Sequence, residues 1–179
     1  MLELVFVIAV IGILAVAIIP RMDRDVLYEA TEQVIRDIRY TQHMAMTDDV
    51  YDADKQFWYY ERWKIDFSTA NTYTVSKGDA AGHFTDHNVT ARDPLSHAAI
   101  DGTEDFDLDN KYKVTFPNSG ILFFDMMGRP YHVNPAADPL RPTSNLLKTD
   151  FTLVLKDSSD KNATITVAPE TGYVTVKYQ

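Results

Sequence analysis

The first twenty residues read MLELVFVIAVIGILAVAIIP (1–20), and Glu3 is the only charged residue among them. An unbroken apolar run of 16 residues, Leu4 to Ile19, follows this glutamate and ends at Pro20. A carboxylate at the centre of a bilayer costs roughly 3 kcal/mol or more, so a residue of this kind is expected to meet a partner charge. The stretch therefore predicts a helix that pairs Glu3 with a cation inside or beside a membrane.

The length of the run leaves alternatives to consider. At about 1.5 Å per residue it reaches roughly 24–27 Å, slightly short of a hydrocarbon core of about 30 Å. A secretory signal peptide is one rival, but no basic segment precedes the run and no small-x-small cleavage site follows it. A buried core helix is another, but apolarity on every face favours lipid or a packed helical bundle. Residues 1–20 are therefore expected to be a transmembrane or filament-core segment.

The rest of the chain, residues 21–179, is long enough for one globular domain with its own core. Ten Tyr, nine Phe and two Trp argue against disorder. The absence of Cys excludes disulfides, thiolate metal sites and Cys nucleophiles. A net charge of −9 repels nucleic acid, so we do not expect nucleic acid as a partner.

The helical pattern continues beyond Pro20 to about position 48. Small and apolar residues recur there at helical spacing, namely Leu27, Thr31, Val34, Ile38, Thr41 and Ala45. Proline removes a backbone donor and clashes with the carbonyl of Val16, so a kink or a melted stretch is expected at Pro20. Gly12 is a second weak point. The whole first element is nevertheless predicted to be one long helix of about 45 residues, amphipathic over about 21–48.

From residue 57 onward the pattern becomes β, with aromatic and alternating segments separated by turns. The expected strands are 57–60, 63–67, 72–76, 113–116, 121–124, 151–156, 163–168 and 173–178. Residues 78–110 and 134–142 lack periodicity or are rich in Pro, and are expected to be loops. The predicted fold class is α+β: a long N-terminal helix, half protruding, packs its second half on an antiparallel sheet or two small sheets.

The N-terminal stretch closely resembles the signature of type IV pilins and type II secretion pseudopilins. Glu3 takes the place of the family's glutamate, and Pro20, 17 residues later, that of the proline ending the membrane segment. The family's mature start usually reads Phe-Thr-Leu-Ile-Glu after a glycine at which the prepilin peptidase cleaves. That glycine and the first two mature residues have no counterpart here, so neither the cleavage site nor the N-methylated first residue is assigned to a position.

Weaker similarities point to a subgroup. Residues 30–45, 116–120 and 165–174 resemble the helix and two glycine-ending β segments of the GspH/FimT-type minor pseudopilins. This resemblance favours a minor subunit over a major one. It implies a structural role without catalysis, in a type IV pilus or a type II secretion pseudopilus.

The resemblance also implies partners and a location. A subunit of this family rests in the bacterial inner membrane as a single-pass protein, with its domain in the periplasm, before it joins a periplasmic pseudopilus or a cell-surface pilus. Its partners are other pilin subunits, the inner-membrane assembly platform and the prepilin peptidase. Glu3 is expected to pair with the N-terminal amine of an adjacent subunit's helix, while Gly12 and Pro20 let the helix unwind as subunits crowd.

Two loops contain candidate metal ligands. Asp105, Asp107 and Asp109 alternate as at the start of a calcium loop, but Asn110 and Phe116 stand where that loop needs Gly and Glu. Two histidines and an aspartate, His83, Asp86 and His87, approximate a zinc motif without a helix to carry it. A solvated acidic loop and an exposed polar loop are the simpler interpretations, and no other cofactor is expected.

Other function classes remain open on the sequence. A major pilin, or a tip subunit that binds a ligand or DNA, fits the same N-terminal stretch. The aromatic cluster at 57–63 suits either a binding face or a strand packed on the long helix. An anchored enzyme is the remaining class, but no Gly-x-Ser-x-Gly, His-Glu-x-x-His or phosphate-loop motif appears.

Overall fold

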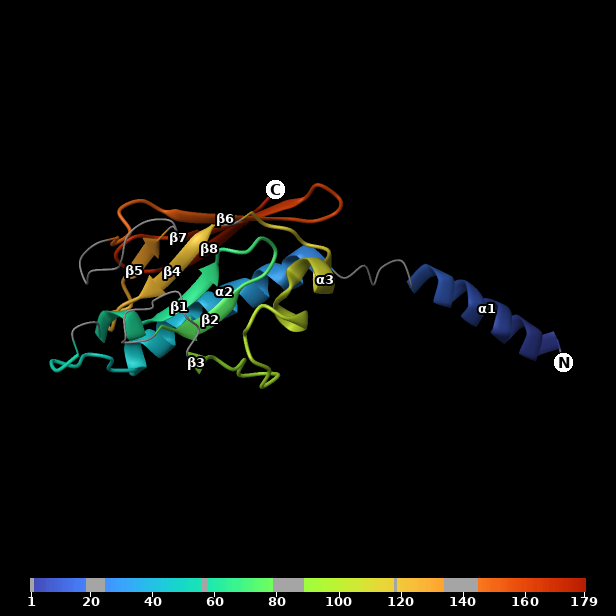
Figure 1. Ribbon diagram of the computed structural model, residues 1–179. Helices are drawn as coiled ribbons and strands as arrows, with labels where there is room; N and C mark the ends of the chain where they lie inside the picture. Colours follow the sequence, from blue (N-terminus) through green and yellow to red (C-terminus); the bar gives the residue numbers. More distant parts are fainter. Residues whose placement is uncertain (1, 19–24, 56–57, 79–88, 118, 134–144) are drawn as a thin grey trace.

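Two helices and two sheets account for most of the structure. The computed structural model describes residues 2–18, 25–55, 58–78, 89–117, 119–133 and 145–179, with side chains in the first range limited to 3–12. Helix α1 (Leu2–Ile18) lies apart from the rest, whereas α2 (Val26–Thr47) lies against the sheets (Figure 1). We refer to the described residues from 25 onward as the body.

The predicted long N-terminal helix is wrong. α1 ends at Ile18, and α2 begins at Val26 as a separate helix with its own N-cap. The Asp25 side chain accepts a hydrogen bond from the Tyr28 backbone N–H at 3.2 Å. In a continuous helix, a backbone carbonyl of the preceding turn would accept this hydrogen bond instead. The predicted class, in which one continuous helix packs half its length on a sheet, is corrected to two separate helices, of which α2 packs on the sheets.

The predicted single-pass location in the inner membrane is also contradicted. None of the helices in the described part of the chain is long and apolar enough to cross a membrane.

The larger sheet has five antiparallel strands in the order β3-β2-β1-β4-β5. Their bounds are β1 Trp63–Phe67, β2 Thr74–Lys77, β3 Val89–Thr90, β4 Gly120–Phe124 and β5 Pro130–Val133. β1 lies at the centre, with Ile65 opposite Val75 on one side and Leu122 on the other. All five residues of β4 are buried, since α2 covers one face and aromatic residues the other.

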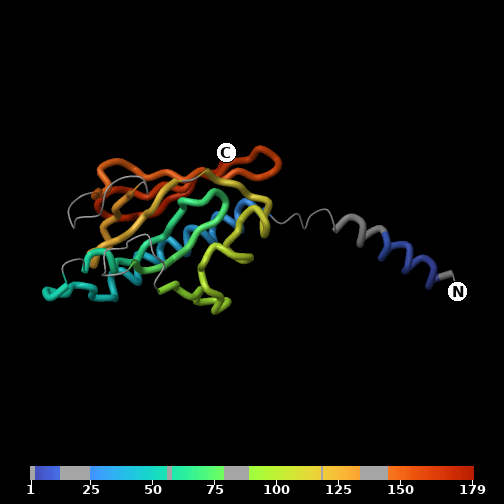
Figure 2. The backbone as a smooth tube through the Cα atoms, viewed as in Figure 1, coloured from blue at the N-terminus to red at the C-terminus, as the bar shows by residue number. Residues whose placement is uncertain are grey.

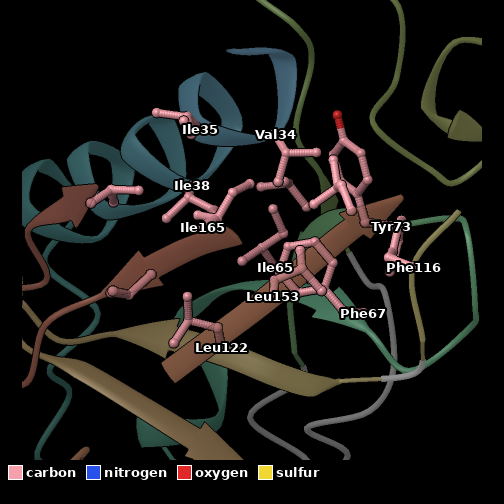
Figure 3. Close-up of a cluster of buried hydrophobic side chains, with 14 of the residues drawn as sticks. Val34, Ile35, Ile38, Ile65, Phe67, Tyr73, Phe116, Leu122, Leu153 and Ile165 are labelled. Carbon is pink, nitrogen blue, oxygen red and sulfur yellow. The ribbon is translucent and has the colours of Figure 1, made fainter. Parts of the chain in front are cut away.

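The smaller sheet has three antiparallel strands in sequence order: β6 (Phe151–Lys156), β7 (Asn162–Val167) and β8 (Val174–Tyr178). Buried and more exposed residues alternate along β6 and β7, so one face of each strand packs inward. α2 contacts strands of both sheets, and Figure 3 shows Ile38 close to Ile165 and near Leu122. The core therefore lies between α2 and the two sheets.

Two predicted strands are wrong. Residues Trp58–Glu61 form a short 3₁₀ helix, η2, rather than a strand, and its Tyr60 packs against β4 and β5. The segment expected at 113–116 follows α3 (Leu108–Tyr112), a short helix preceded by η3 (Glu104–Phe106). Lys113 ends α3 in the left-handed conformation, with φ of 56°, because its N–H turns back to the Asp109 and Leu108 carbonyls.

Candidate assembly surface

α1 presents bare apolar side chains. Leu4, Val5, Phe6, Val7 and Ile8 are each 53–69% exposed, and Ile11 is 59% exposed. Apolar residues occupy every side of the helix over residues 4–12, so none of the faces described there is distinguished as one that packs on the body. Figures 1 and 2 show α1 extending away from the body. An exposed apolar surface of this extent marks an interaction site.

Glu3 lies in the first turn of α1 and is exposed. The N-terminal end of a helix carries a partial positive charge, so a carboxylate is favourable at this position. It is the only charged side chain described on α1. The structure thus places one acidic group at the end of an otherwise apolar surface.

The other two predicted assembly residues are less informative. A Cβ atom built on Gly12 would meet nothing within 4 Å, so this glycine has open space around it. Its effect is that of a weak helix former in an exposed helix. Pro20 lies outside the described residues.

A buried polar network fixes α2 to the rest of the body. The sequence pattern did not reveal this network. The Tyr73 hydroxyl donates to Asp37 Oδ2 at 2.6 Å, and Gln33 Nε2 donates to the Tyr73 hydroxyl at 2.9 Å. Burial raises the pKa of Asp37, and the Tyr73 hydrogen bond and the Arg36 charge offset this rise only in part. The pKa of Tyr73 is raised well above its usual value, chiefly by burial and to a smaller extent by Asp37.

Arg36 joins this network to the loop after β3. Its Nε donates to Asp37 Oδ1 at 3.1 Å, and its other end lies 3.2 Å from Asp93 Oδ1. Burial alone would raise the pKa of Asp93, but the Ser96 hydroxyl and backbone N–H outweigh it and lower that pKa. The cluster holds α2 in place and offers no nucleophile or open acid–base pair.

The three predicted calcium ligands occupy different structural positions. Asp105 pairs with Lys111 Nζ at 3.3 Å, while Asp107 caps α3 by accepting from the Asn110 backbone N–H at 3.0 Å. Asp109 lies within α3 and is exposed. Among the described residues, no group of three His, Asp or Glu side chains is placed to hold a metal ion. Calcium binding stays an untested prediction, and His83, Asp86 and His87 lie outside the described residues.

The aromatic cluster is divided between two places. Trp63 belongs to the core beside α2, and its Nε1 donates to Asp48 Oδ2 at 2.9 Å. Tyr59 and Tyr60 instead pack on the opposite side of the larger sheet. The cluster therefore does not form one strand packed on a long helix.

Comparison with known proteins adds nothing to this geometry: no family model, no curated protein and no solved structure matches the chain. Its function has to be inferred from its own residues.

Proposed function

We propose that this chain is a structural subunit of a pilin-like filament, and a minor subunit rather than the main one. The exposed apolar surface of α1 carries the proposal. Removing such surface from water favours association by about 25 cal/mol per Å². A protein helix also draws most of its stability from packing its apolar surface against other elements, and the described α1 side chains have no such packing. Packing α1 against the helices of neighbouring subunits would bury this surface and stabilise the helix.

Glu3 gives this packing a register. Within a bundle of apolar helices, a carboxylate is costly unless a positive group neutralises it. The resemblance to pilins supplies that group as the N-terminal amine of an adjacent subunit's helix. The attraction grows as water is excluded, although desolvation cancels part of it. Glu3 therefore favours one axial offset between helices that apolar contact alone would leave free to slide.

The body supports the proposal because its hydrophobic core includes none of the described α1 side chains. This core closes between α2 and the two sheets. The similarity to GspH/FimT-type subunits favours the minor role. A major pilin is the main alternative, and the abundance of this subunit in sheared filaments separates the two.

Cross-linking tests the packing of α1. The chain has no Cys, so Val7→Cys introduces a single thiol into this helix. We expect mild oxidation of the full chain to give a disulfide-linked dimer, because in the absence of other subunits the apolar surface of α1 packs against α1 of a second copy. Adding Glu3→Ala should reduce the dimer yield several-fold, whereas Glu3→Asp should retain most of it.

Leu95→Cys is the matched control, because Leu95 is 74% exposed on a loop of the body. It should give only the slow dimer expected from random collision. Equal dimer yields from the two thiols, or a Val7→Cys dimer insensitive to Glu3→Ala, would refute the proposed assembly.

A further inference from the structure

A second candidate binding site, besides the surface of α1, lies near the C-terminal end of α2. A cavity of about 240 Å³ opens between η2 and the turn that joins β4 to β5. We call it the Met pocket, and its main lining residues are Trp58, Arg62, Met126, Met127, Arg129 and Tyr131. Gln42 Nε2, near the end of α2, donates to the Gly128 carbonyl of the same turn at 2.8 Å. The pocket is therefore remote from the end of α2 that leads to α1.

Arg62 is the unusual residue in this pocket, since it is 7% exposed but lacks a carboxylate partner among the described residues. Aromatic rings surround it instead. Its guanidinium carbon lies 5.4 Å from the centre of the Trp58 ring, 5.2 Å from that of Tyr131 and 6.0 Å from that of Phe123. These contacts stabilise a cation but do not neutralise it.

The one acidic residue lining the pocket is already bound. Asp125 Oδ2 accepts from Arg129 Nε at 2.7 Å and from the Tyr131 hydroxyl at 3.1 Å. Its Oδ1 accepts two backbone N–H groups, those of Met127 and Arg129, at 2.9 Å each. Burial lowers the pKa of Arg62, and the nearby Tyr131 and Asp125 do not restore it. The positive charge of Arg62 is thus incompletely balanced.

The rim of the pocket is apolar and adaptable. Met126 is 51% and Met127 69% exposed, and Val50 adds a further apolar contact. Methionine side chains adjust to varied apolar partners. Trp, Tyr and Arg are the residue types that most often dominate binding energy at protein interfaces. At about 240 Å³ the cavity is smaller than the roughly 300–1,000 Å³ typical of small-molecule sites, and it suits one or two side chains of a partner protein.

We propose that the Met pocket binds an apolar side chain of a partner protein with a carboxylate next to it, such as a Leu-Asp pair. The apolar group enters between Trp58 and the two methionines, and the carboxylate receives hydrogen bonds from Arg62. Charge-assisted hydrogen bonds of this kind are roughly twice as strong as neutral ones. The pocket does not involve α1, so this inference stands independently of the filament proposal.

Two capped pentapeptides test the proposal, one with a central Leu-Asp and one with a central Leu-Asn. Binding to the full chain is followed by fluorescence anisotropy of a dye on the peptide. We expect the Leu-Asp peptide to bind about tenfold more tightly or better. Arg62→Lys should reduce this preference, and Arg62→Met should abolish it, provided that circular dichroism shows the variants folded.

Met127→Ser covers the case in which the Arg62 variants fail to fold, because Met127 is exposed and its loss leaves the core intact. It should weaken binding of both peptides several-fold, while Leu95→Ser, on a distant exposed loop, should not. Equal affinity for the two peptides, or binding unaffected by Met127→Ser, overturns the proposal. Self-association of the chain that Met127→Ser abolishes would identify a second copy as the occupant and overturn it as well. Peptide binding reports on the Met pocket and Val7→Cys cross-linking reports on α1, so failure of this inference is distinguishable from failure of the filament proposal.

Discussion

At the scale of single residues, Asp37 is a fully buried ionisable group whose charge is costly. Tyr73 and Arg36 both bond to it, but burial dominates and its pKa is raised. A carboxyl group with a raised folded pKa binds its proton more tightly in the folded state than in the unfolded state. The free energy of unfolding therefore falls as pH rises through the folded pKa of Asp37.

We predict that Asp37→Asn removes this pH dependence. The variant should gain stability relative to the parent chain as pH rises from below the usual aspartate pKa, near 3.8, towards neutrality. Urea unfolding at a series of pH values and constant ionic strength measures the difference. Asp93→Asn is the opposite control, because the pKa of Asp93 is lowered and its stabilising effect is lost as pH falls. A pH-independent gap between Asp37→Asn and the parent chain contradicts the assignment.

At the scale of elements, the beginning of α2 depends on the side chain of Asp25. Asp25 satisfies the Tyr28 N–H at the N-terminal end of the helix. We expect Asp25→Ala to lower the free energy of unfolding by about 1 kcal/mol, within the usual range for loss of an N-cap. Asp25→Ser retains an acceptor and should cost much less. Thermal unfolding followed by circular dichroism at 222 nm, the usual helix wavelength, measures both, and equal losses in the two variants argue against capping.

Elements with a strong local pattern could be predicted from the sequence. The end of α2 near Asp48 is confirmed, as are the strands around β1, β4, β6, β7 and β8. β5 (Pro130–Val133) was missed because it is short and begins with proline. The break between α1 and α2 was underestimated, since helical periodicity runs on through Pro20 while the new cap at Asp25 is a local contact that periodicity does not report.

The candidate sites also differ in how well the sequence predicts them. Glu3 stands out in the sequence because a lone charge interrupts a continuous apolar segment. The Met pocket does not, because η2 and the β4–β5 turn, which build it, are more than 60 residues apart in the chain. Asp37 was hidden for a related reason, since its buried partner Tyr73 lies 36 residues further along the chain, just before β2. Contacts between distant segments leave no spacing to recognise.

At the scale of the whole molecule, the body has a core that is separate from α1. Ile38 is fully buried between α2 and the sheets, whereas Ile8 is 62% exposed on α1. We expect Ile38→Ala to cost about 2–5 kcal/mol of unfolding free energy, and Ile8→Ala to change it by no more than about 0.5 kcal/mol. Urea unfolding of the full chain, followed by tryptophan fluorescence, compares them. A large effect of Ile8→Ala would show that α1 packs on the body.

The dependence of α2 on β8 has a consequence for the order in which the chain is made. Arg39 donates to the Val174 carbonyl, a partner 135 residues further along the chain. At about 5–20 residues per second, translation delivers β8 roughly 6–25 seconds after α2 has left the ribosome. During that interval the apolar stripe of α2 has no smaller sheet to cover it, and α1 is already exposed beside it in sequence. We therefore expect holding chaperones to shield two surfaces of the nascent chain: one that the body later buries, and one that, on our proposal, only other subunits cover.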